Sequence, residues 1–412
     1  MAPLGPFEPA PLLAVAVSGG ADSLALALLA DGWARARGGA AVGLIVDHRL
    51  RPESGEEAAV TAQRLAARGI PAEILTLHGL QPGPALAERA REARYAALTA
   101  GARRRGIVHL LLGHHAGDQA ETVAMRRLSG SGADGLAGMA AVAETGDVRL
   151  LRPLLGVPPG WMRRWLREHE MEWVEDPSNR NPKALRSRLR ALSADAAGDG
   201  VLIRAAGEAA AARGEARARR EAAVAAELAE RVAFHAEAYA LLAPGPLSPA
   251  ALAALLRTLG GAAHAPSPAQ VAALAANPRP ATLGGVRLLP AGRLGCGFLL
   301  CREEAAMAPP RAASPGAVWD GRFRLRTAAC PPEGAEIGAV GVAAELRKLP
   351  MARALPAAVR RTLPAIRREG RLCAVPHLGW PDAATFAAVP LDFAPSRPAA
   401  AAPFRPAGPV LA

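Results

Sequence analysis

The stretch "LLAVAVSGGADSLALALL", residues 12–29, joins two apolar runs through a loop of glycines, hydroxyls and one carboxylate. Residues 12–17 form a short continuous apolar run, which predicts a buried strand, and residues 22–37 are long enough for a helix. Gly19 and Gly20 let backbone amides come close to a ligand, and the helix N-terminus adds its positive dipole. The stretch therefore predicts an anion site between a strand and a helix.

The alternation of strand and helix continues along the chain. Apolar runs recur at 41–47, 72–77 and 107–113, and helix-length segments follow them at 53–68, 86–105 and 116–128. This order predicts a Rossmann-like α/β fold, in which helices cover both faces of a parallel sheet. Ligands bind such sheets at the carboxyl ends of the strands. We therefore expect the site at the polar residues that follow the first, second and fourth strands.

Asp22 indicates which kind of anion site the loop forms. The Gly-Lys-Ser/Thr of a Walker A loop and the third glycine of the dinucleotide fingerprint are both absent. A carboxylate that faces a phosphate is favourable when Mg²⁺ lies between them, because hard cations bridge carboxylate and phosphate oxygens. Ser18 and Ser23 offer hydroxyls to the same ligand. The alternative is an ordinary helix N-terminus that Asp22 and Ser23 cap.

The rest of the chain has a different pattern. A helix carries Trp161 and Trp165, and an Ala/Arg/Glu-rich helix follows at about 205–233. Later segments hold a helix, proline-rich turns, short strand-like pieces and a linker at 307–317. We predict four parts: a catalytic domain at 1–200, a helical linker and middle domain at 201–306, a small mixed C-terminal domain at 318–393, and a disordered tail at 394–412.

Charge and cysteine usage restrict the class of protein. The 412 residues carry a formal net charge of +12, which favours a polyanionic partner such as nucleic acid, with a solvated arginine-rich surface as the alternative. The four cysteines all follow residue 295 and form no Cys-x-x-Cys pair, which argues against a zinc ribbon. The first residues lack a basic start, and no apolar run approaches the length of a membrane span. We expect a cytoplasmic protein that does not contact membranes.

Ser-Gly-Gly-x-Asp-Ser resembles the pyrophosphate loop (PP-loop) of the N-type ATP pyrophosphatases, whose fold is the adenine nucleotide alpha hydrolase-like α/β fold. Further stretches resemble the tRNA(Ile)-lysidine synthetase family in order and spacing, over most of residues 12–190: "VDHRLR" (46–51), "AREARY" (90–95), "GHHAGDQAETVAMRRLSGSGADGLAGM" (113–139), "LLRPLL" (150–155) and "EDPSNRNPKALRSRLR" (175–190). The resemblance implies ATP as substrate, Mg²⁺, free L-lysine and the isoleucine tRNA with a CAU anticodon, and it leaves room for a homodimer. The implied reaction adenylylates C2 of the wobble cytidine and then joins lysine there, giving lysidine, AMP and diphosphate.

The resemblance also assigns roles to individual residues. The catalytic residues are Asp22, His114, Asp118 and Glu121, of which Asp22 and Asp118 also hold the metal. ATP is bound by Ser18, Gly19, Gly20, Ala21, Asp22, Ser23, His48, Arg94 and Arg186. The tRNA is bound by Arg126, Arg127, Arg188 and Arg190.

Each assignment has a plainer alternative. Asp118 and Glu121 are three residues apart on one helix, so they share a face, but such a pair can also be a solvated face or an N-terminal cap. His114 and His115 can be buried, satisfied histidines, and we expect this above all for His115. Gly117 stands where the family often has a second acidic residue, which weakens the case for another metal ligand.

Residues 129–139 are rich in glycine, which predicts a mobile loop beside the site, or else a plain connector.

Two other functions remain open. A tRNA thiolase has the same loop, but its chemistry generally needs cysteines near the nucleotide, and residues 1–295 contain none. A non-catalytic RNA-binding relative would be expected to have lost part of the set formed by Ser18, Asp22, Asp118 and Glu121.

Overall fold

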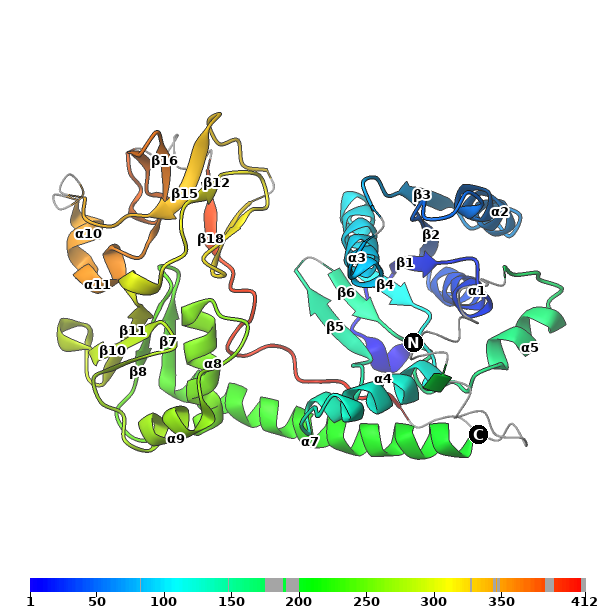
Figure 1. Cartoon of the computed structure of the whole chain (residues 1–412), viewed down its shortest axis with the longest axis horizontal. Helices are drawn as coiled ribbons and strands as arrows, with labels where there is room; N and C mark the ends of the chain where they lie inside the picture. Colours follow the sequence, from blue (N-terminus) through cyan, green and yellow to red (C-terminus); the bar gives the residue numbers. More distant parts are fainter. Residues whose placement is uncertain are drawn as a thin grey trace. The chain divides into compact units, whose positions relative to one another are not determined.

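The computed structural model describes residues 1–81, 83–146, 148–174, 188–189, 200–326, 328–343, 346, 349–381 and 389–408. The chain divides into two compact units (Figure 1). The first, Met1–Arg219 with Ala402–Ala412, is called the catalytic unit below, and the second, Arg220–Ala401, the distal unit. The chain therefore passes from one unit to the other twice. The domain boundaries expected from the sequence stay predictions.

The catalytic unit contains a six-stranded sheet in the order β3-β2-β1-β4-β6-β5, parallel except for β5. Its strands are β1 (Leu12–Val17), β2 (Ala40–Asp47), β3 (Ala72–Thr76), β4 (His109–Leu112), β5 (Val142–Thr145) and β6 (Val148–Leu151). The chain runs outward from β1 to β3 and then returns to β4 on the other side of β1. The carboxyl ends of β1 and β4 therefore form a topological switch point, where open α/β sheets bind ligands.

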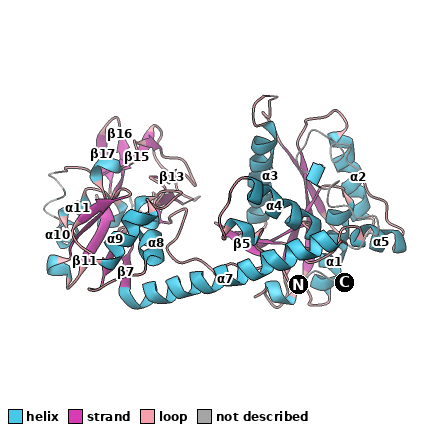
Figure 2. Cartoon of the chain, turned by 60° about the horizontal axis from the view of Figure 1, so that its bottom comes forward, coloured by secondary structure: helices cyan, strands magenta, loops and turns pink. Residues whose placement is uncertain are grey.

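Helices cover both faces of this sheet (Figures 1 and 2). α1 (Ala21–Arg35) and α2 (Ser54–Ala66) pack on one face and α3 (Leu86–Arg104) on the other. The catalytic unit also contains α4 (Ala116–Leu128), α5 (Trp161–Glu168), which packs against α1, and the first part of α7 (Val201–Arg231). Leu13 and Val15 of β1 pack into the core that includes α1, whereas Ala14 packs into the core that includes α3. Both faces of β1 are thus buried, as its continuous apolar run predicts.

The predicted α/β fold is confirmed, and the first four strands and their helices lie within a few residues of their expected ranges. The edge hairpin of β5 and β6 was not expected. The Pro/Ala segment that the composition predicts to be disordered is described as far as residue 408. In it, the carbonyl of Arg405 accepts a hydrogen bond from the amide of Ala141 at 2.8 Å, and the side chain of Phe404 is buried.

The distal unit contains three antiparallel sheets, in the orders β7-β8-β11-β10-β9, β12-β15-β16-β17 and β13-β14-β18. Its helices are α8 (Pro249–Gly260), α9 (Pro268–Ala276), α10 (Pro350–Ala354) and α11 (Ala357–Arg360). The strands are β7 (Val232–His235), β8 (Tyr239–Leu242), β9 (Ala281–Leu283), β10 (Val286–Pro290), β11 (Phe298–Arg302), β12 (Arg311–Ala312), β13 (Val318–Trp319), β14 (Phe323–Leu325), β15 (Ala335–Ala339), β16 (Pro364–Arg368), β17 (Arg371–Ala374) and β18 (Leu391–Phe393). The described part of 201–306 thus contains the helices α7, α8 and α9 and also a five-stranded sheet, of which the sequence shows only short pieces.

No helix in the described part of the chain is both long and apolar enough to cross a membrane.

A buried charge cluster fixes the centre of the distal unit. The Asp320 carboxylate accepts hydrogen bonds from Arg302 and Arg322, at distances of 2.8 to 3.0 Å, and from the amide of Ala308 at 2.9 Å. These bonds outweigh the effect of burial, so the pKa of Asp320 lies below its usual range. The carboxylate is therefore the compensating charge for two buried guanidinium groups.

Asp320→Ala should destabilise the distal unit by about 3–5 kcal/mol, because it leaves two buried cations without their carboxylate. Hydrogen exchange of peptides from 298–325, followed in the full-length protein, measures this loss. Asp392→Ala is the matched control, since its pair with Arg326 is exposed and should matter little. Equal effects of the two variants would contradict the role given to Asp320.

Candidate functional site

The loop after β1 is held in shape by the hydroxyl of Ser23. Ser23 Oγ accepts a hydrogen bond from the amide of Ser18 at 3.0 Å and donates one to the carbonyl of Gly20 at 3.0 Å. The hydroxyl oxygen of Ser18 lies 3.1 Å from Oγ of Ser23. Ser23 is buried, so its hydroxyl holds the backbone of the loop from the protein interior. Ser18 and the first amides of α1 are the groups placed to meet an anion.

Gly19 is required by the close approach of α2. Its φ is +83°, and a Cβ built on it would lie 2.6 Å from Oγ1 of Thr61. The carbonyl of Gly19 also accepts a hydrogen bond from the amide of Val174 at 2.9 Å. Gly20, in contrast, has a φ of −71° and no atom within 3.5 Å of its own built Cβ. Only the first of the two glycines is thus dictated by the folded chain itself.

The helix after β4 begins with a capping box around His115. Nδ1 of His115 accepts hydrogen bonds from the amides of Gly117 at 3.0 Å and Asp118 at 3.3 Å, and Oδ2 of Asp118 accepts one from the amide of His115 at 3.0 Å. Because Nδ1 is the acceptor, a neutral imidazole carries its proton on Nε2. This reciprocal bonding gives α4 a fixed first turn and agrees with the structural role expected for His115.

The same imidazole brings the acidic residues of two loops together. Nε2 of His115 lies 3.9 Å from Oδ2 of Asp22, and Nδ1 lies 3.7 Å from Oδ2 of Asp118. Asp22 lies in the first turn of α1, after β1, and Asp118 in the first turn of α4, after β4, so each carboxylate comes from a helix that begins at the switch point (Figure 1). Glu121, one turn further along α4, is buried. The structure thus brings Asp22 and Asp118 together and places Glu121 on the helix that carries Asp118.

This donor set suits a metal ion that arrives with phosphate. Among the described residues, no group of three His, Cys, Asp or Glu side chains is arranged to hold a metal ion. Mg²⁺ usually needs only one or two protein carboxylates, because substrate phosphates and water complete its six oxygen ligands. Asp22 and Asp118 provide that number beside the phosphate loop.

Gly117 has a local explanation. A Cβ at this position would lie 2.8 Å from Cε1 of His115 and 3.1 Å from a side-chain carbon of Pro159. An acidic residue at 117 therefore cannot share this space with the capping imidazole.

His114, next to the cap, is a neutral imidazole at physiological pH. Its pKa is lowered to about 4, chiefly by burial and also by the charges of Arg152, Arg91 and Arg94, while Asp118 opposes the shift. Its Nδ1 is buried without a hydrogen-bond partner among the described residues. A neutral imidazole can donate one hydrogen bond to a ligand oxygen, but it has no spare proton to release near pH 7.

Two arginines, one from α3 and one that follows β6, lie close to His114 at the carboxyl ends of the strands. The charge of Arg94, on α3, lowers the pKa of both His48 after β2 and His114 after β4, so Arg94 lies near the ends of both strands. Arg152, directly after β6, is largely buried, hydrogen-bonds the hydroxyl of Tyr95, and donates to the carbonyl of Ala140 at 2.7 Å. These guanidinium groups provide positive charge close to the carboxylate pair.

The loop after β2 lines an open pocket. Oδ1 of Asp47 accepts hydrogen bonds from the amide of Arg49 at 2.9 Å and the hydroxyl of Ser54 at 2.7 Å, and the pKa of this buried carboxyl is lowered by these bonds against the effect of burial. The pocket has a volume of about 480 Å³ and is lined by Asp47, Arg49, Leu50, Arg51, Pro52, Ser54 and Gly55. It adjoins the end of the strand next to the phosphate loop, where a nucleoside could lie.

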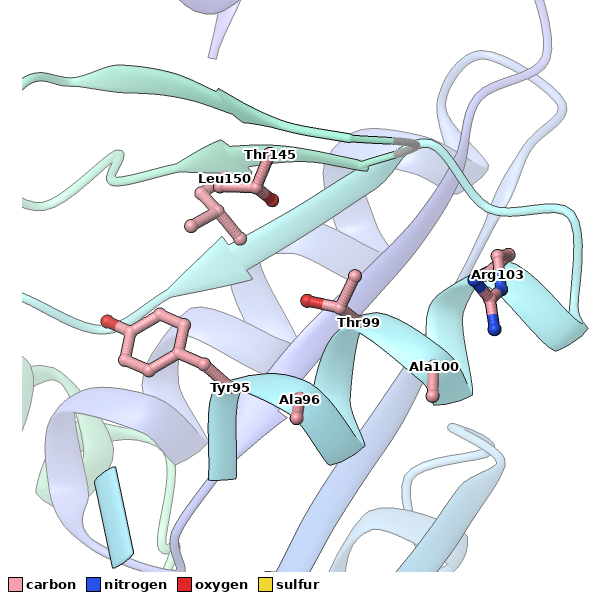
Figure 3. Close-up of a pocket in the computed structure, with 7 residues that line it drawn as sticks. All are labelled: Tyr95, Ala96, Thr99, Ala100, Arg103, Thr145 and Leu150. Atoms are coloured by element: carbon pink, nitrogen blue, oxygen red, sulfur yellow. The ribbon is translucent and has the colours of Figure 1, made fainter. Parts of the chain in front are cut away.

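A second pocket, of about 300 Å³, runs along α3 (Figure 3). Tyr95 lies at one end and Arg103 at the other, with Ala96, Thr99 and Ala100 between them and Thr145 and Leu150 opposite. Tyr95 connects this pocket to the site through its bond to Arg152.

The arginines expected to bind tRNA have different surroundings. Nη1 of Arg126 donates to the carbonyls of Gly135 and Gly138 at 2.8 and 2.7 Å, so it holds the glycine-rich loop. Arg127 and Arg188 are exposed. Arg186 and Arg190 lie outside the described residues.

The glycine-rich loop, 129–139, makes several hydrogen bonds to α4, and its predicted mobility stays a prediction. Besides its bonds to Arg126, it contains a short 3-10 helix at Gly135–Ala137. The side-chain amide of Gln119 both donates to and accepts from the backbone of Met139.

Sequence reasoning missed Asp47, Gln119 and Arg152. Arg152 had a readable signal, because it interrupts the apolar run "LLRPLL" at the end of a strand. Gln119 had none, since a polar residue on α4 next to Asp118 is equally consistent with an exposed face.

Gly19→Ala should lower the free energy of unfolding of the catalytic unit by about 1–3 kcal/mol, because the new Cβ meets Thr61 at an unfavourable φ. Thermal denaturation of the full-length protein measures the loss. Gly20→Ala is the matched control and should melt close to wild type. A melting temperature of Gly19→Ala equal to that of Gly20→Ala would contradict the close approach of α2.

His114 should make stability depend on pH in the window between its two pKa values. In the unfolded chain the imidazole takes up a proton near pH 6.5, whereas in the folded chain it does so only near pH 4. The stability that the neutral imidazole gives to the folded chain is therefore fully present above pH 6.5 and is lost as the pH falls toward 4.

When the pH is lowered from 7.5 to 5.0, the free energy of unfolding of the wild type should fall by up to about 2 kcal/mol more than that of His114→Gln. Urea unfolding of both proteins at the two pH values gives the difference. If both lose the same stability, His114 is not held neutral by the fold.

Comparison with known proteins gives the family. The PP-loop domain family matches residues 3–194. A tRNA(Ile)-lysidine synthase of Ruegeria pomeroyi is 37% identical over 332 residues, which cover 77% of this chain and 77% of that protein. One of Mesorhizobium japonicum is 37% identical over 329 residues, covering 75% of this chain and 71% of that protein.

Other relatives match over about half of the chain. A tRNA(Ile)-lysidine synthase of Bradyrhizobium sp. is 41% identical over 198 residues, 48% of this chain and 55% of that protein. The chain thus spans about half the length of this relative, and the same holds for further curated relatives. A solved structure of a U34-tRNA thiolase from Methanococcus maripaludis aligns with a TM-score of 0.42 and 17% identity, over 50% of this chain and 75% of that one.

The resemblance that five separate motifs indicate is therefore confirmed over most of the chain, and the chain belongs to the tRNA(Ile)-lysidine synthase family.

Proposed function

We propose that the chain joins free L-lysine to C2 of the wobble cytidine in the isoleucine tRNA with a CAU anticodon, at the expense of ATP. One observation carries the proposal: beside the phosphate loop, the carboxylates of Asp22 and Asp118 both lie within 4 Å of the imidazole of His115, at 3.9 and 3.7 Å. The named activity of the relatives supports it. The reaction belongs to the cytoplasm, where tRNA is modified, and the homodimer stays a prediction.

The first step moves the α-phosphate of ATP onto the C2 oxygen of the cytidine, and diphosphate leaves. Ser18 and the first amides of α1 hold the phosphate chain, and the pocket after β2, beside His48, takes the nucleoside. Mg²⁺ held by Asp22 and Asp118 would neutralise charge on the phosphate oxygens. Positive charge from Arg94 stabilises the phosphate as it becomes pentavalent.

His114 contributes a hydrogen bond in this step. Since its pKa is lowered to about 4, it meets the phosphate as a neutral donor. It therefore orients an oxygen and does not transfer a proton to the leaving group, one of the roles that a histidine at this position would otherwise have.

The second step forms a bond between the lysine ε-nitrogen and C2, and AMP leaves with the former C2 oxygen. Glu121 is the group we assign to the lysine amine. Its carboxylate can attract the ammonium and take one proton from it, which frees the nitrogen lone pair for attack on C2; the second proton, lost after the bond forms, passes to solvent or to the departing AMP. Glu121 is buried on the helix that carries Asp118, so both carboxylates act from one rigid element.

The thiolase alternative finds no support in the chain. Residues 1–295 contain no cysteine that could carry sulfur or ligate a cluster near the nucleotide. The intact set of Ser18, Asp22, Asp118 and Glu121 is likewise difficult to reconcile with a non-catalytic RNA-binding protein.

The full-length protein, Mg-ATP, radiolabelled lysine and a CAU isoleucine tRNA transcript should give labelled tRNA and an equal amount of AMP. Asp118→Asn and Glu121→Gln should each reduce labelling by on the order of 10²-fold or more. Glu168→Gln, an exposed acid on α5, is the control that should keep wild-type activity.

Labelling from a sulfur donor in place of lysine would overturn the proposal in favour of a thiolase. AMP release without any change in the tRNA would leave only the ATP chemistry of the loop.

A further inference from the structure

The last described segment of the chain, residues 402–408, lies on the catalytic unit and is called the tail latch here. We propose that the tail latch positions the glycine-rich loop beside α4 and so sets the rate of the reaction proposed above, on which this inference rests. The residues that act are Phe404 and Arg405, neither of which touches the acidic site itself.

Phe404 is seated on helix α7. Its side chain is buried, and a Cβ built on Gly214 would lie 2.8 Å from the Phe404 ring and 2.8 Å from Pro406. Glycine inside a long helix costs roughly 1 kcal/mol relative to alanine. Here the missing side chain provides the space that the aromatic ring occupies.

Arg217 connects this ring to the glycine-rich loop. Its guanidinium carbon lies 4.6 Å from the centroid of Phe404, and its Nη1 lies 3.3 Å from the carbonyl of Asp134. Its charge also lowers the pKa of Arg126, so the two guanidinium groups are close. Arg126 in turn bonds Gly135 and Gly138 from α4. The loop is thus held from both sides, by an arginine of α4 and by an arginine that rests on Phe404.

Arg405 fixes the other end of the loop through the sheet edge. Its carbonyl accepts from the amide of Ala141 at 2.8 Å, and it forms a bridge with Val142 of the edge strand β5. Its Nη1 donates to the carbonyl of Gly5 at 2.7 Å. Arg405 therefore ties the N-terminal segment to the point where the glycine-rich loop enters the sheet.

The latched segment adjoins the groups that do the chemistry. Ala140 accepts from Arg152, which lies beside His114. The backbone of Met139 makes two hydrogen bonds with the side chain of Gln119, the residue after Asp118. Residues 139–142 are therefore a continuous layer of contacts between the latch on one side and the catalytic helix on the other. Loop 18–23 has no contact with the latch among those described.

This arrangement predicts a selective effect. Loss of the latch should lower kcat, because the glycine-rich loop and Arg152 lose their fixed positions, whereas ATP binding at loop 18–23 should be unaffected. Phe404→Leu tests this, because it keeps an apolar side chain in the buried site but removes the ring on which Arg217 rests. Phe404→Tyr keeps the ring and is the conservative rescue. Phe234→Leu, on β7 of the distal unit, is the matched control.

Phe404→Leu should lower kcat about tenfold or more, since small misplacements of positioning groups have effects of this size. Its Kd for ATP should stay within about twofold of wild type, and Phe404→Tyr and Phe234→Leu should keep wild-type kcat. If Phe404 acts through Arg217, the variant that combines Phe404→Leu with Arg217→Gln should be no slower than the slower single variant. Effects that multiply, or an unchanged kcat in Phe404→Leu, would overturn the proposal.

Hydrogen exchange separates this inference from the proposed function. In Phe404→Leu, amides of 131–142 should exchange faster, whether or not the protein makes lysidine. If these amides exchange faster in Phe404→Leu but the wild-type protein labels no tRNA, the proposed function is refuted and the positioning role of the tail latch is supported. Unchanged exchange would refute the latch even if wild type is active.

Discussion

The hydrogen bonds that the imidazole of His115 accepts from the amides of Gly117 and Asp118 are the contacts on which the site depends. They fix the first turn of α4 and therefore the direction in which Asp118 and Glu121 leave it. They also fix the orientation of the ring, which places Nε2 3.9 Å from Oδ2 of Asp22 on α1. One ring thus relates two acidic elements that are almost a hundred residues apart in the sequence.

Charge around this ring is divided by position. The carboxylates lie at the starts of α1 and α4, whereas the guanidinium groups come from α3 and from the end of β6. His114 lies between them and stays neutral, because burial and three arginines outweigh the one nearby carboxylate. Acidic and basic side chains thus lie within one site, and such fixed charges can stabilise the charge that develops when a phosphoryl group is transferred.

The first four strands, the first four helices and the phosphate loop could be predicted because each follows from a local pattern. The apolar run of β1 and the Gly-Gly-x-Asp-Ser sequence need no knowledge of the rest of the chain. The hairpin of β5 and β6 could not be predicted, since short edge strands have weak patterns and depend on their neighbours. The same holds for the site: the family motifs pointed to Asp22 and Asp118, but Arg126 looks like a free cation in the sequence and is committed to Gly135 and Gly138 in the fold. Which cations are engaged is set by tertiary contacts.

The return of the chain to its first unit has a consequence for the order of synthesis. Proteins are made from the N-terminus, and domains generally fold as they emerge. The distal unit separates Gly214 on α7 from Phe404, the residue that covers it, so the ribosome makes the covering residue only after the whole distal unit. A nascent catalytic unit can therefore build its sheet and its phosphate loop but cannot complete the surface of α7. Completion of this surface marks a chain whose distal unit has already been made.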